Sequence, residues 1–218
     1  YKILIAVCTI AVLFFCGVEQ TTSQVTDKDG NVYKTVKINT QEWMSENLNV
    51  EHYRNGDIIP QVQDEDTWYK LKTGAWCYYE HDTENGKTYG KLYNWHAVND
   101  PRGLAPEGCH IPSKSEWSVL IEYLGGESKA GSKMKAETLW REPNTGATNK
   151  SSFSAYPGGY RISIGEFYDK GKLSHFWASN ELEKDFAHTV ELYYFKKDAI
   201  MRINLKAGGL SIRCLKDQ

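Results

Sequence analysis

The segment Glu142-Pro143-Asn144 carries a carboxylate and an amide side chain that could contribute oxygen ligands to a metal ion. A carboxylate and an amide supply the hard oxygen ligands that Ca²⁺ prefers, but Ca²⁺ takes about six to eight oxygens, so further ligands would be required. So short a motif also matches easily by chance. Asn144 and Asn149 are typical of turns in which the side chain bonds its own backbone. The sequence therefore predicts no cofactor, with calcium as the alternative.

A second candidate chemistry is glycoside hydrolysis by the acidic residues Asp64, Glu65 and Asp66. That reaction needs two carboxyl groups facing each other across a bond, about 5 to 9 Å apart. Adjacent acids within a polar segment do not indicate such a pair, and acidic residues mostly lie on the surface. We therefore expect a solvated loop and no enzyme.

The histidines and glycines offer no clearer catalytic group. The six His residues are scattered, and none has the spacing of a zinc site. His110 stands just before a helix start, where we expect it to fix a turn through a hydrogen bond. The glycine-rich segment 157–160 lacks the Lys and the strand-to-helix context of a phosphate-binding loop.

Aromatic residues make up 13% of the chain, with seven Trp and fourteen Tyr. Amphipathic rings are favoured at contact surfaces, although a loop-rich domain can also use them to fill its interior. We take as candidate ligand-binding residues those that stand in or beside predicted loops. They are Trp68, Tyr69, Trp140, Asn144, Tyr168 and Trp177.

The elements that would position these side chains are mainly strands. Ser113 and Glu116 form a capping box, and Trp117 begins an apolar series at helical spacing that ends at Gly125. A shorter helix is expected over 128–137. Strands are expected over 32–38, 188–195, 200–205 and 210–215, a second strand or a turn-rich link over 41–48, and long loops over 55–71 and 141–149. This order indicates an α+β fold with short antiparallel strands, one or two helices and long structured loops.

Five segments occur in an order that carries a family resemblance: 89–98 (YGKLYNWHAV), 112–117 (PSKSEW), 143–148 (PNTGAT), 157–161 (PGGYR) and 211–217 (SIRCLKD). They resemble the Fibrobacter succinogenes major paralogous domain, a family of bacterial exported proteins related to C-type lectin-like folds. The resemblance covers roughly Val25 to Asp217. The sequence departs from the family at Cys109, where Trp is usual, and at His96, where Tyr is usual.

The resemblance implies a C-type lectin-like fold and no assigned reaction. In sugar-binding C-type lectins a Glu-Pro-Asn tripeptide and a later Trp-Asn-Asp segment hold calcium. Glu142, Asn144 and Asn180 are the matching residues here, although the segment Trp177-Ala-Ser-Asn180 is a loose match. Formylglycine-generating enzymes share the fold type but use paired cysteines, whereas only Cys214 stands late in this chain.

The first residues form a short apolar run, which predicts a signal peptide over 1–24 and a single domain over 25–218. Cys16 with Gly17 is a candidate lipidation site, although Phe15 is larger than a lipoprotein signal prefers, and cleavage near 21–23 is the alternative. A lipid on Cys16 would be the chain's one link to a membrane. We expect an extracellular or outer-membrane location in a bacterium.

Three cysteines remain after such a leader: Cys77, Cys109 and Cys214. The odd number leaves one unpaired. In lectin-like folds the last strand is commonly tied back, so the resemblance implies a disulfide at Cys214, with its partner open. Cys77 matches a family cysteine and is the favoured partner, whereas Cys109 is the favoured free thiol.

The charge balance restricts the partners. With 26 basic and 28 acidic residues the net charge is -2, and no basic run is present, so we expect no nucleic-acid binding. We expect an exported, non-catalytic module that binds an extracellular glycan or a surface protein. The alternatives are a structural component of an envelope assembly and a hydrolase. An exposed row of aromatic rings would favour carbohydrate binding. A contiguous apolar patch would favour the assembly component, and two facing carboxylates in a cleft would favour the hydrolase.

Overall fold

The computed structural model describes residues 23–218, and residues 1–22, with Cys16, lie outside the described part. The strands are β1 (Gln24–Thr26), β2 (Val32–Ile38), β3 (Gln41–Met44), β4 (Trp76–Cys77), β5 (Leu92–Tyr93), β6 (Cys109–His110), β7 (Tyr160–Arg161), β8 (Phe167–Tyr168), β9 (Leu173–Glu183), β10 (Phe186–Tyr193), β11 (Ile200–Leu205) and β12 (Leu215–Lys216). The helices are α1 (Glu65–Lys70), α2 (Thr83–Tyr89), α3 (Trp95–Val98), α4 (Lys114–Tyr123), α5 (Glu127–Met134) and the 3₁₀ turn η1 (Tyr79–His81).

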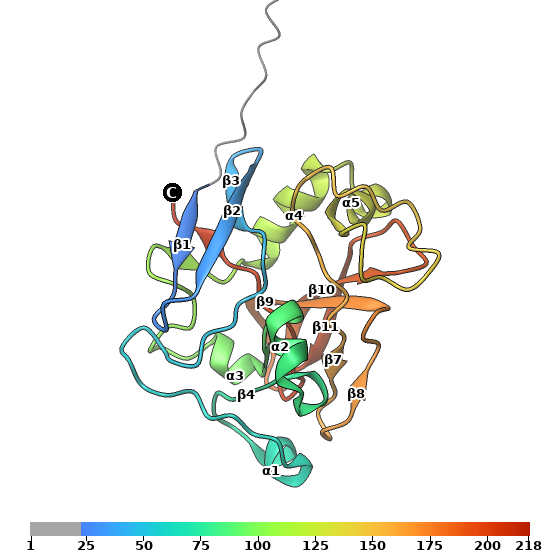
Figure 1. Cartoon of the computed structure of the whole chain (residues 1–218). Coiled ribbons are helices and arrows are strands. Elements are labelled where there is room, and N and C mark those ends of the chain that lie inside the picture. Colours follow the sequence, from blue (N-terminus) through green and yellow to red (C-terminus); the bar gives the residue numbers. More distant parts are fainter. Residues whose placement is uncertain (1–22) are drawn as a thin grey trace, which may run out of the picture.

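A five-stranded antiparallel sheet joins the two ends of the described chain (Figure 1). Its order is β1-β2-β3-β12-β6, so the last strand lies between β3 and β6. Leu215 is the residue of β12 that faces both neighbours, since it pairs with Trp43 on one side and with His110 on the other. The remote segments of the chain are thereby held in one sheet.

The second sheet contains the three long strands in the order β11-β10-β9. Side chains alternate between the two faces of a strand, and β9 follows this rule with two large aromatic residues. Phe176 belongs to the apolar cluster with Trp117 and Phe153, whereas Trp177 belongs to the cluster with Tyr93. Strand β9 therefore separates two hydrophobic cores.

Aromatic rings fill the core between α4 and the sheets. Trp43 lies 4.7 Å from Trp117 and 5.7 Å from Phe153 between ring centroids, and Trp117 stacks on Phe176 at 5.6 Å. Tilted and edge-on pairs of this kind suit the ring quadrupoles and add to the benefit of burial. Part of the high aromatic content is thus used for packing.

Helix α4 confirms the predicted start, because Ser113 caps it and the reciprocal bond to Glu116 completes the capping box. Strands β2 and β11 also match the expected bounds. The prediction of a continuous loop over 55–71 was wrong, because Asp64 caps the short helix α1 by accepting from the Thr67 N–H at 2.8 Å. The strand expected over 210–215 was wrong in its bounds, because only Leu215 belongs to a strand, β12, while Leu210 and Ser211 form isolated bridges to Tyr93 and Phe176.

Buried cationic side chains hold the long loops. The Arg213 guanidinium donates to the carbonyls of Met44 (3.1 Å), Ser154 (2.7 Å) and Phe153. Lys135 donates to three carbonyls, among them that of Lys196 at 2.8 Å. Each cation donates hydrogen bonds to backbone carbonyl groups that have no partner in a helix or a sheet. Buried carbonyl groups need such partners.

The expected disulfide between Cys77 and Cys214 is absent. Within residues 23–218, Cys77, Cys109 and Cys214 are all unpaired and buried. Cys77 packs with Trp68 in one cluster, whereas Cys214 and Cys109 lie together in another. Burial raises the pKa of Cys77 to about 12 and that of Cys109 to about 11, so neither thiol is ionised at neutral pH.

The described chain is therefore of the α+β class, with mostly antiparallel sheets and a few helices. None of the helices within residues 23–218 has the length and apolar character needed to span a bilayer.

Candidate functional site

Three of the six predicted ligand-binding residues are buried, so their selection as surface residues was wrong. The indole N–H groups of Trp68, Trp140 and Trp177 donate to the carbonyls of Ala207 (2.7 Å), Ala155 (3.0 Å) and Tyr93 (2.8 Å). A buried Trp needs such a partner for its one polar group. These rings stabilise the loops beside which they stand and present no face to a ligand.

Tyr69, Asn144 and Tyr168 are the remaining predicted residues. Tyr69 is exposed on α1, and Tyr168 is exposed on β8. Asn144 is half-buried in a left-handed turn and donates from Nδ2 to the Ala136 carbonyl at 3.1 Å. Asn144 is therefore a turn residue, as expected, but its side chain bonds the remote Ala136 and not its own backbone.

The oxygen ligands of the candidate calcium site are not brought together. Asn144 lies beside the end of β10, where the Thr145 N–H donates to the Tyr194 carbonyl at 2.7 Å. Asn180 lies at the other end of this sheet, beside the pair Glu181 and Ala187. The length of β10 between these two points corresponds to roughly 20 Å. Asn180 instead accepts from the Lys114 N–H at 2.5 Å, at the start of α4.

Asp64 and His110, the other residues considered for catalysis, make hydrogen bonds that stabilise the fold. Asp64 caps α1, and the hydrogen bonds from Thr67 hold its pKa below the ordinary value. His110 fastens β6 to two carboxylates, those of Asp217 (2.6 Å) and Glu116 (2.9 Å). Partial burial opposes the charged form of His110, but these carboxylates outweigh it and raise its pKa. Within residues 23–218, no three His, Cys, Asp or Glu side chains gather as metal ligands.

Aromatic side chains on the hairpin of β7 and β8 and at the end of β10 form two pairs, which His175 on β9 and Glu191 on β10 connect. We call Tyr168, Tyr160, Tyr193 and Phe195 the aromatic row. The rings of Tyr160 and Tyr168 are 6.2 Å apart, and those of Tyr193 and Phe195 are 5.5 Å apart. Tyr168 is 43% and Phe195 48% exposed, while Tyr160 and Tyr193 are half-buried.

Polar groups join the two halves of the aromatic row. The buried ring of His175 meets Tyr160 edge-on at 5.4 Å, and its Nε2 lies 3.4 Å from a carboxylate oxygen of Glu191. The other oxygen of Glu191 accepts from the Tyr193 hydroxyl at 2.7 Å. The row therefore has rings along its length and a carboxylate at its centre, which can accept hydrogen bonds from a ligand.

Burial determines the protonation states of His175 and Glu191. It lowers the pKa of His175 to about 3, so the imidazole is neutral, and it raises the pKa of Glu191. Desolvation opposes the charged form in both cases. Burial and the bond to Glu191 also raise the pKa of Tyr193.

The sequence analysis missed Tyr160, Tyr193, Phe195 and Glu191. The sequence did contain a sign that Glu191, Tyr193 and Phe195 lie together. Side chains alternate along the predicted strand 188–195, which places residues 191, 193 and 195 on one face. Nothing in the sequence showed that the hairpin of β7 and β8 would lie beside that face.

The sequence model of one protein family, the Fibrobacter succinogenes major domain, matches residues 36–216. No curated protein matches the chain significantly. No solved structure matches it either, so the C-type lectin-like architecture stays a prediction.

Proposed function

The chain belongs to the Fibrobacter succinogenes major domain family, and from this premise we propose that it is a non-catalytic module that recognises carbohydrate through the aromatic row. The single observation that carries the proposal is the row itself, with Tyr168 and Phe195 exposed on either side of the Glu191 carboxylate. Flat apolar ring faces suit the C–H faces of pyranose rings, and Tyr contributes contact area at low entropic cost.

The polar centre supports this assignment. Sugar hydroxyls need acceptors that are held in place, because an acceptor that must be ordered on binding weakens the complex. Glu191 is held by the Tyr193 hydroxyl, and Arg202 approaches its carboxylate at 3.9 Å. As part of the same proposal, the module acts outside the bacterial cell, either secreted or anchored through a lipid on Cys16.

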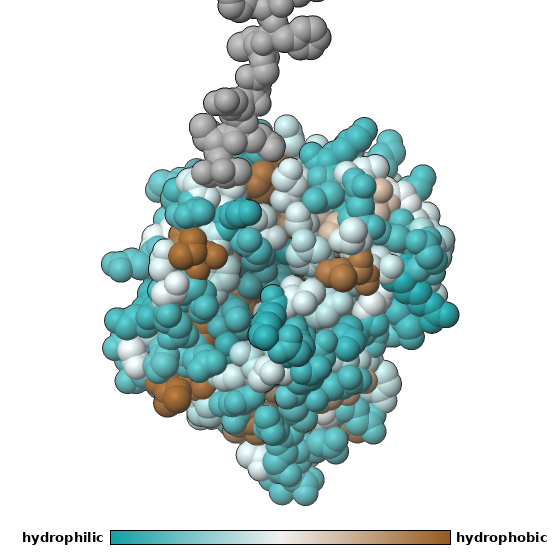
Figure 2. All heavy atoms as spheres, in the orientation of Figure 1, coloured by the Kyte–Doolittle hydropathy of each residue, from teal (hydrophilic) through white to brown (hydrophobic). Residues whose placement is uncertain are grey.

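A structural role in an envelope assembly is the second candidate. Strand β11 is an edge of its sheet, and Ile203 on it is 51% exposed, as in strands that pair with another chain. The face drawn in Figure 2 is mainly hydrophilic, with small and separate hydrophobic spots. That face offers no large apolar patch for subunit contact. Carbohydrate recognition is the proposal we favour because of the aromatic row.

The test is a binding screen of the purified protein against soluble glycans and insoluble polysaccharides, once with calcium and once with a chelator. We expect binding that does not depend on calcium. Tyr168→Ala and Tyr193→Ala should each weaken it about tenfold, since a stacked ring contributes about 0.5–1.5 kcal/mol beyond its area.

Tyr123→Ala is the matched control, because Tyr123 is an exposed tyrosine on α4, away from the aromatic row. Equal losses for Tyr123→Ala and Tyr168→Ala would sink the assignment of the site. Binding that disappears with the chelator would point to a calcium site in its place, and no binding at all would favour the assembly component.

A further inference from the structure

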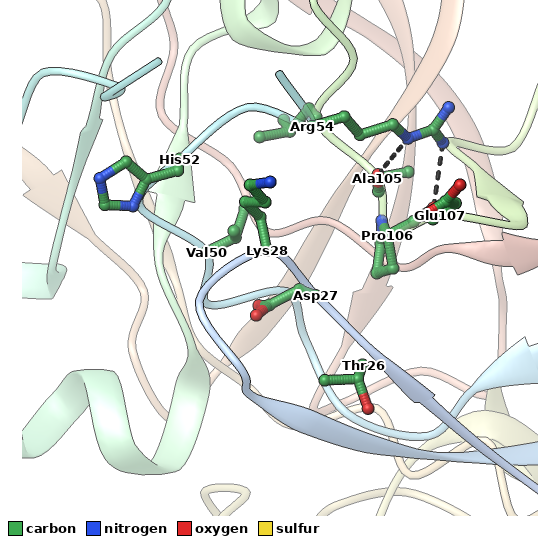
Figure 3. A pocket seen from close by; sticks show the side chains of 10 residues that line it. Thr26, Asp27, Lys28, Val50, His52, Arg54, Ala105, Pro106 and Glu107 are labelled. Atoms are coloured by element: carbon green, nitrogen blue, oxygen red, sulfur yellow. Dashed lines mark hydrogen bonds between the residues drawn. The ribbon is translucent and has the colours of Figure 1, made fainter. Parts of the chain in front are cut away.

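Two pockets apart from the aromatic row differ in the charges that line them. The pocket beside the turn after β1, drawn in Figure 3, contains Lys28 and Arg54 together with Asp27 and Glu107. Charges of both signs side by side favour neither an anion nor a cation. The second pocket has a volume of about 270 Å³, and its charged residues are Lys37, Lys133 and Lys150. We call it the lysine pocket.

The walls of the lysine pocket come from separate parts of the fold that pack together. Figure 1 shows the hairpin of β2 and β3 on the same side of the molecule as α4 and α5. Ile38 at the end of β2 and Leu124 at the end of α4 are both buried in the hydrophobic cluster that contains Trp117. The N–H and the hydroxyl of Ser151 both donate to the Lys133 carbonyl, at 3.1 and 2.8 Å, and join the loop after α5 to this helix. The walls are thus fixed before any ligand binds.

The charges of the lysine pocket are all positive. Lys37 and Lys150 are exposed, and Lys133 is half-buried. Within residues 23–218, none of the three forms an ion pair with a carboxylate. No acidic side chain is found among the described residues that line the pocket. The protein therefore does not neutralise these three ammonium groups within the pocket.

Two acidic residues stand close to the lysine pocket in the sheet or along the chain, but neither lines it. Glu42 stands opposite Lys37 across β2 and β3, and its carboxylate accepts a hydrogen bond from the Thr35 hydroxyl at 2.6 Å. Glu122 precedes Leu124 by two positions on α4, so the two side chains lie on nearly opposite sides of the helix. Both carboxylates are thereby directed elsewhere.

Lys133 is positioned by the end of α4. Its Nζ lies 3.6 Å from the Cβ position of Gly125, the residue that follows the helix. A cation is favoured there, because the carbonyl groups at a helix C-terminus carry a partial negative charge. Lys37 and Lys150 are exposed and have flexible four-carbon stems, so their ammonium groups can move towards one oxyanion beside Lys133.

We propose that the lysine pocket binds a doubly charged oxyanion, a phosphate monoester, with its oxygens among the ammonium groups of Lys37, Lys133 and Lys150. Hydrogen bonds between ionised groups are about twice as strong as neutral ones, and a lysine binds phosphate as a point charge. A single carboxylate would balance only one of the three charges. This site shares no residue with the aromatic row, so its occupation does not rest on carbohydrate binding there.

The experiment is isothermal titration of the purified protein with glucose 6-phosphate, with glucose as the neutral match and glucose 6-sulfate as the singly charged match. At pH 7.5 glucose 6-phosphate should bind about tenfold more tightly than either. Lys37→Met and Lys150→Met keep the aliphatic stems on two different walls, and each should weaken this binding about tenfold. The control is Lys184→Met, an exposed lysine in the turn between β9 and β10, which should leave it unchanged.

The charge of the ligand provides a second test. A phosphate monoester loses its second proton near about pH 6, so the affinity for glucose 6-phosphate should rise several-fold between pH 5 and pH 7.5. Glucose 6-sulfate keeps one charge over this range and should bind equally at both values. The described residues that line the pocket include no histidine or carboxyl group, so the change would come from the ligand.

Equal affinity for glucose and glucose 6-phosphate would overturn the proposal, as would equal binding by the wild-type protein and both lysine variants. Glucose 6-sulfate binding as tight as glucose 6-phosphate binding at pH 7.5 would overturn the requirement for a double charge. Tyr168→Ala, in the aromatic row, should leave glucose 6-phosphate binding unchanged even if it abolishes polysaccharide binding. Because Tyr123 lines the lysine pocket, Tyr123→Ala is a control for the aromatic row with uncharged glycans only.

Discussion

Among single residues, His175 combines full burial with an incomplete set of hydrogen bonds. Its Nε2 lies 3.1 Å from the Thr189 hydroxyl, whereas its Nδ1 has no partner within the described chain. A buried imidazole in this state is kept neutral, because a positive charge there would lose its hydration. Protonation of His175 is therefore one of the ways in which acid destabilises the folded protein.

The stability of the protein should fall in acid partly because of His175. The unfolded chain binds a proton on this group near pH 6.5, whereas the folded chain binds it only near pH 3. Between these values the unfolded state holds one more proton. The free energy of unfolding should then decrease by about 1.4 kcal/mol per pH unit from this residue alone.

Urea unfolding of the wild-type protein and His175→Gln between pH 7 and pH 3.5 measures this effect. Gln has no titrating ring, so the variant should lose less stability in acid, and the two curves should converge as the pH falls. Parallel curves would show that His175 does not titrate differently in the two states.

The exposure of individual side chains was the least predictable property. Trp68 and Trp177 stand beside loop-like sequence, yet both are buried, because each indole finds a carbonyl from a distant segment. Tyr168, chosen for the same reason, is exposed. Local sequence does not distinguish these cases, since burial depends on which remote backbone covers the ring.

At the scale of elements, buried cationic side chains donate the hydrogen bonds that the carbonyl groups of the long loops do not receive from a helix or a sheet. Arg161 donates to the carbonyls of Gly165 (2.8 Å), Val62 (2.7 Å) and Gln63 (2.7 Å), and thereby holds the segment before α1 against the hairpin of β7 and β8. Arg213 acts in the same way beside β3. Burial lowers the pKa of Arg213 to about 9.

Arg213→Met should destabilise the fold strongly. The variant leaves the carbonyls of Met44, Phe153 and Ser154 without their donor, and the free energy of unfolding should fall by roughly 3–5 kcal/mol. Arg141→Met is the control, because Arg141 is exposed. Denaturant unfolding measures both, and a loss below about 1 kcal/mol for Arg213→Met would contradict this role.

Element prediction succeeded where a long pattern was present. Helix α4 has both a capping box and an apolar face, and strands β2 and β11 alternate over several residues. Helices α1, α2 and α3 span only 6, 7 and 4 residues, too few to establish a period of 3.6. Their formation depends on caps and on tertiary packing.

For the whole molecule, the α+β class followed from the sequence, whereas the order of strands did not. The pairing of β12 with β3 and β6 joins residues more than a hundred positions apart, which no local pattern encodes. The position of Leu215 between these strands makes the C-terminal segment part of the core.

Leu215→Ala should reduce the free energy of unfolding by about 2–5 kcal/mol, because it removes a buried side chain from the cluster around Trp43. Leu205→Ala, on the exposed edge strand β11, should change it by about 0.5 kcal/mol or less. Thermal unfolding of both variants gives the comparison. Similar melting temperatures for the two would contradict the central place of β12.

The placement of β12 also determines when the protein can acquire its structure. A ribosome makes residues 215 and 216 after nearly all of the described chain, and the five-stranded sheet cannot close until they emerge. Until then β3 and β6 lack the strand that lies between them, so this sheet is completed later than the sheet of β9, β10 and β11.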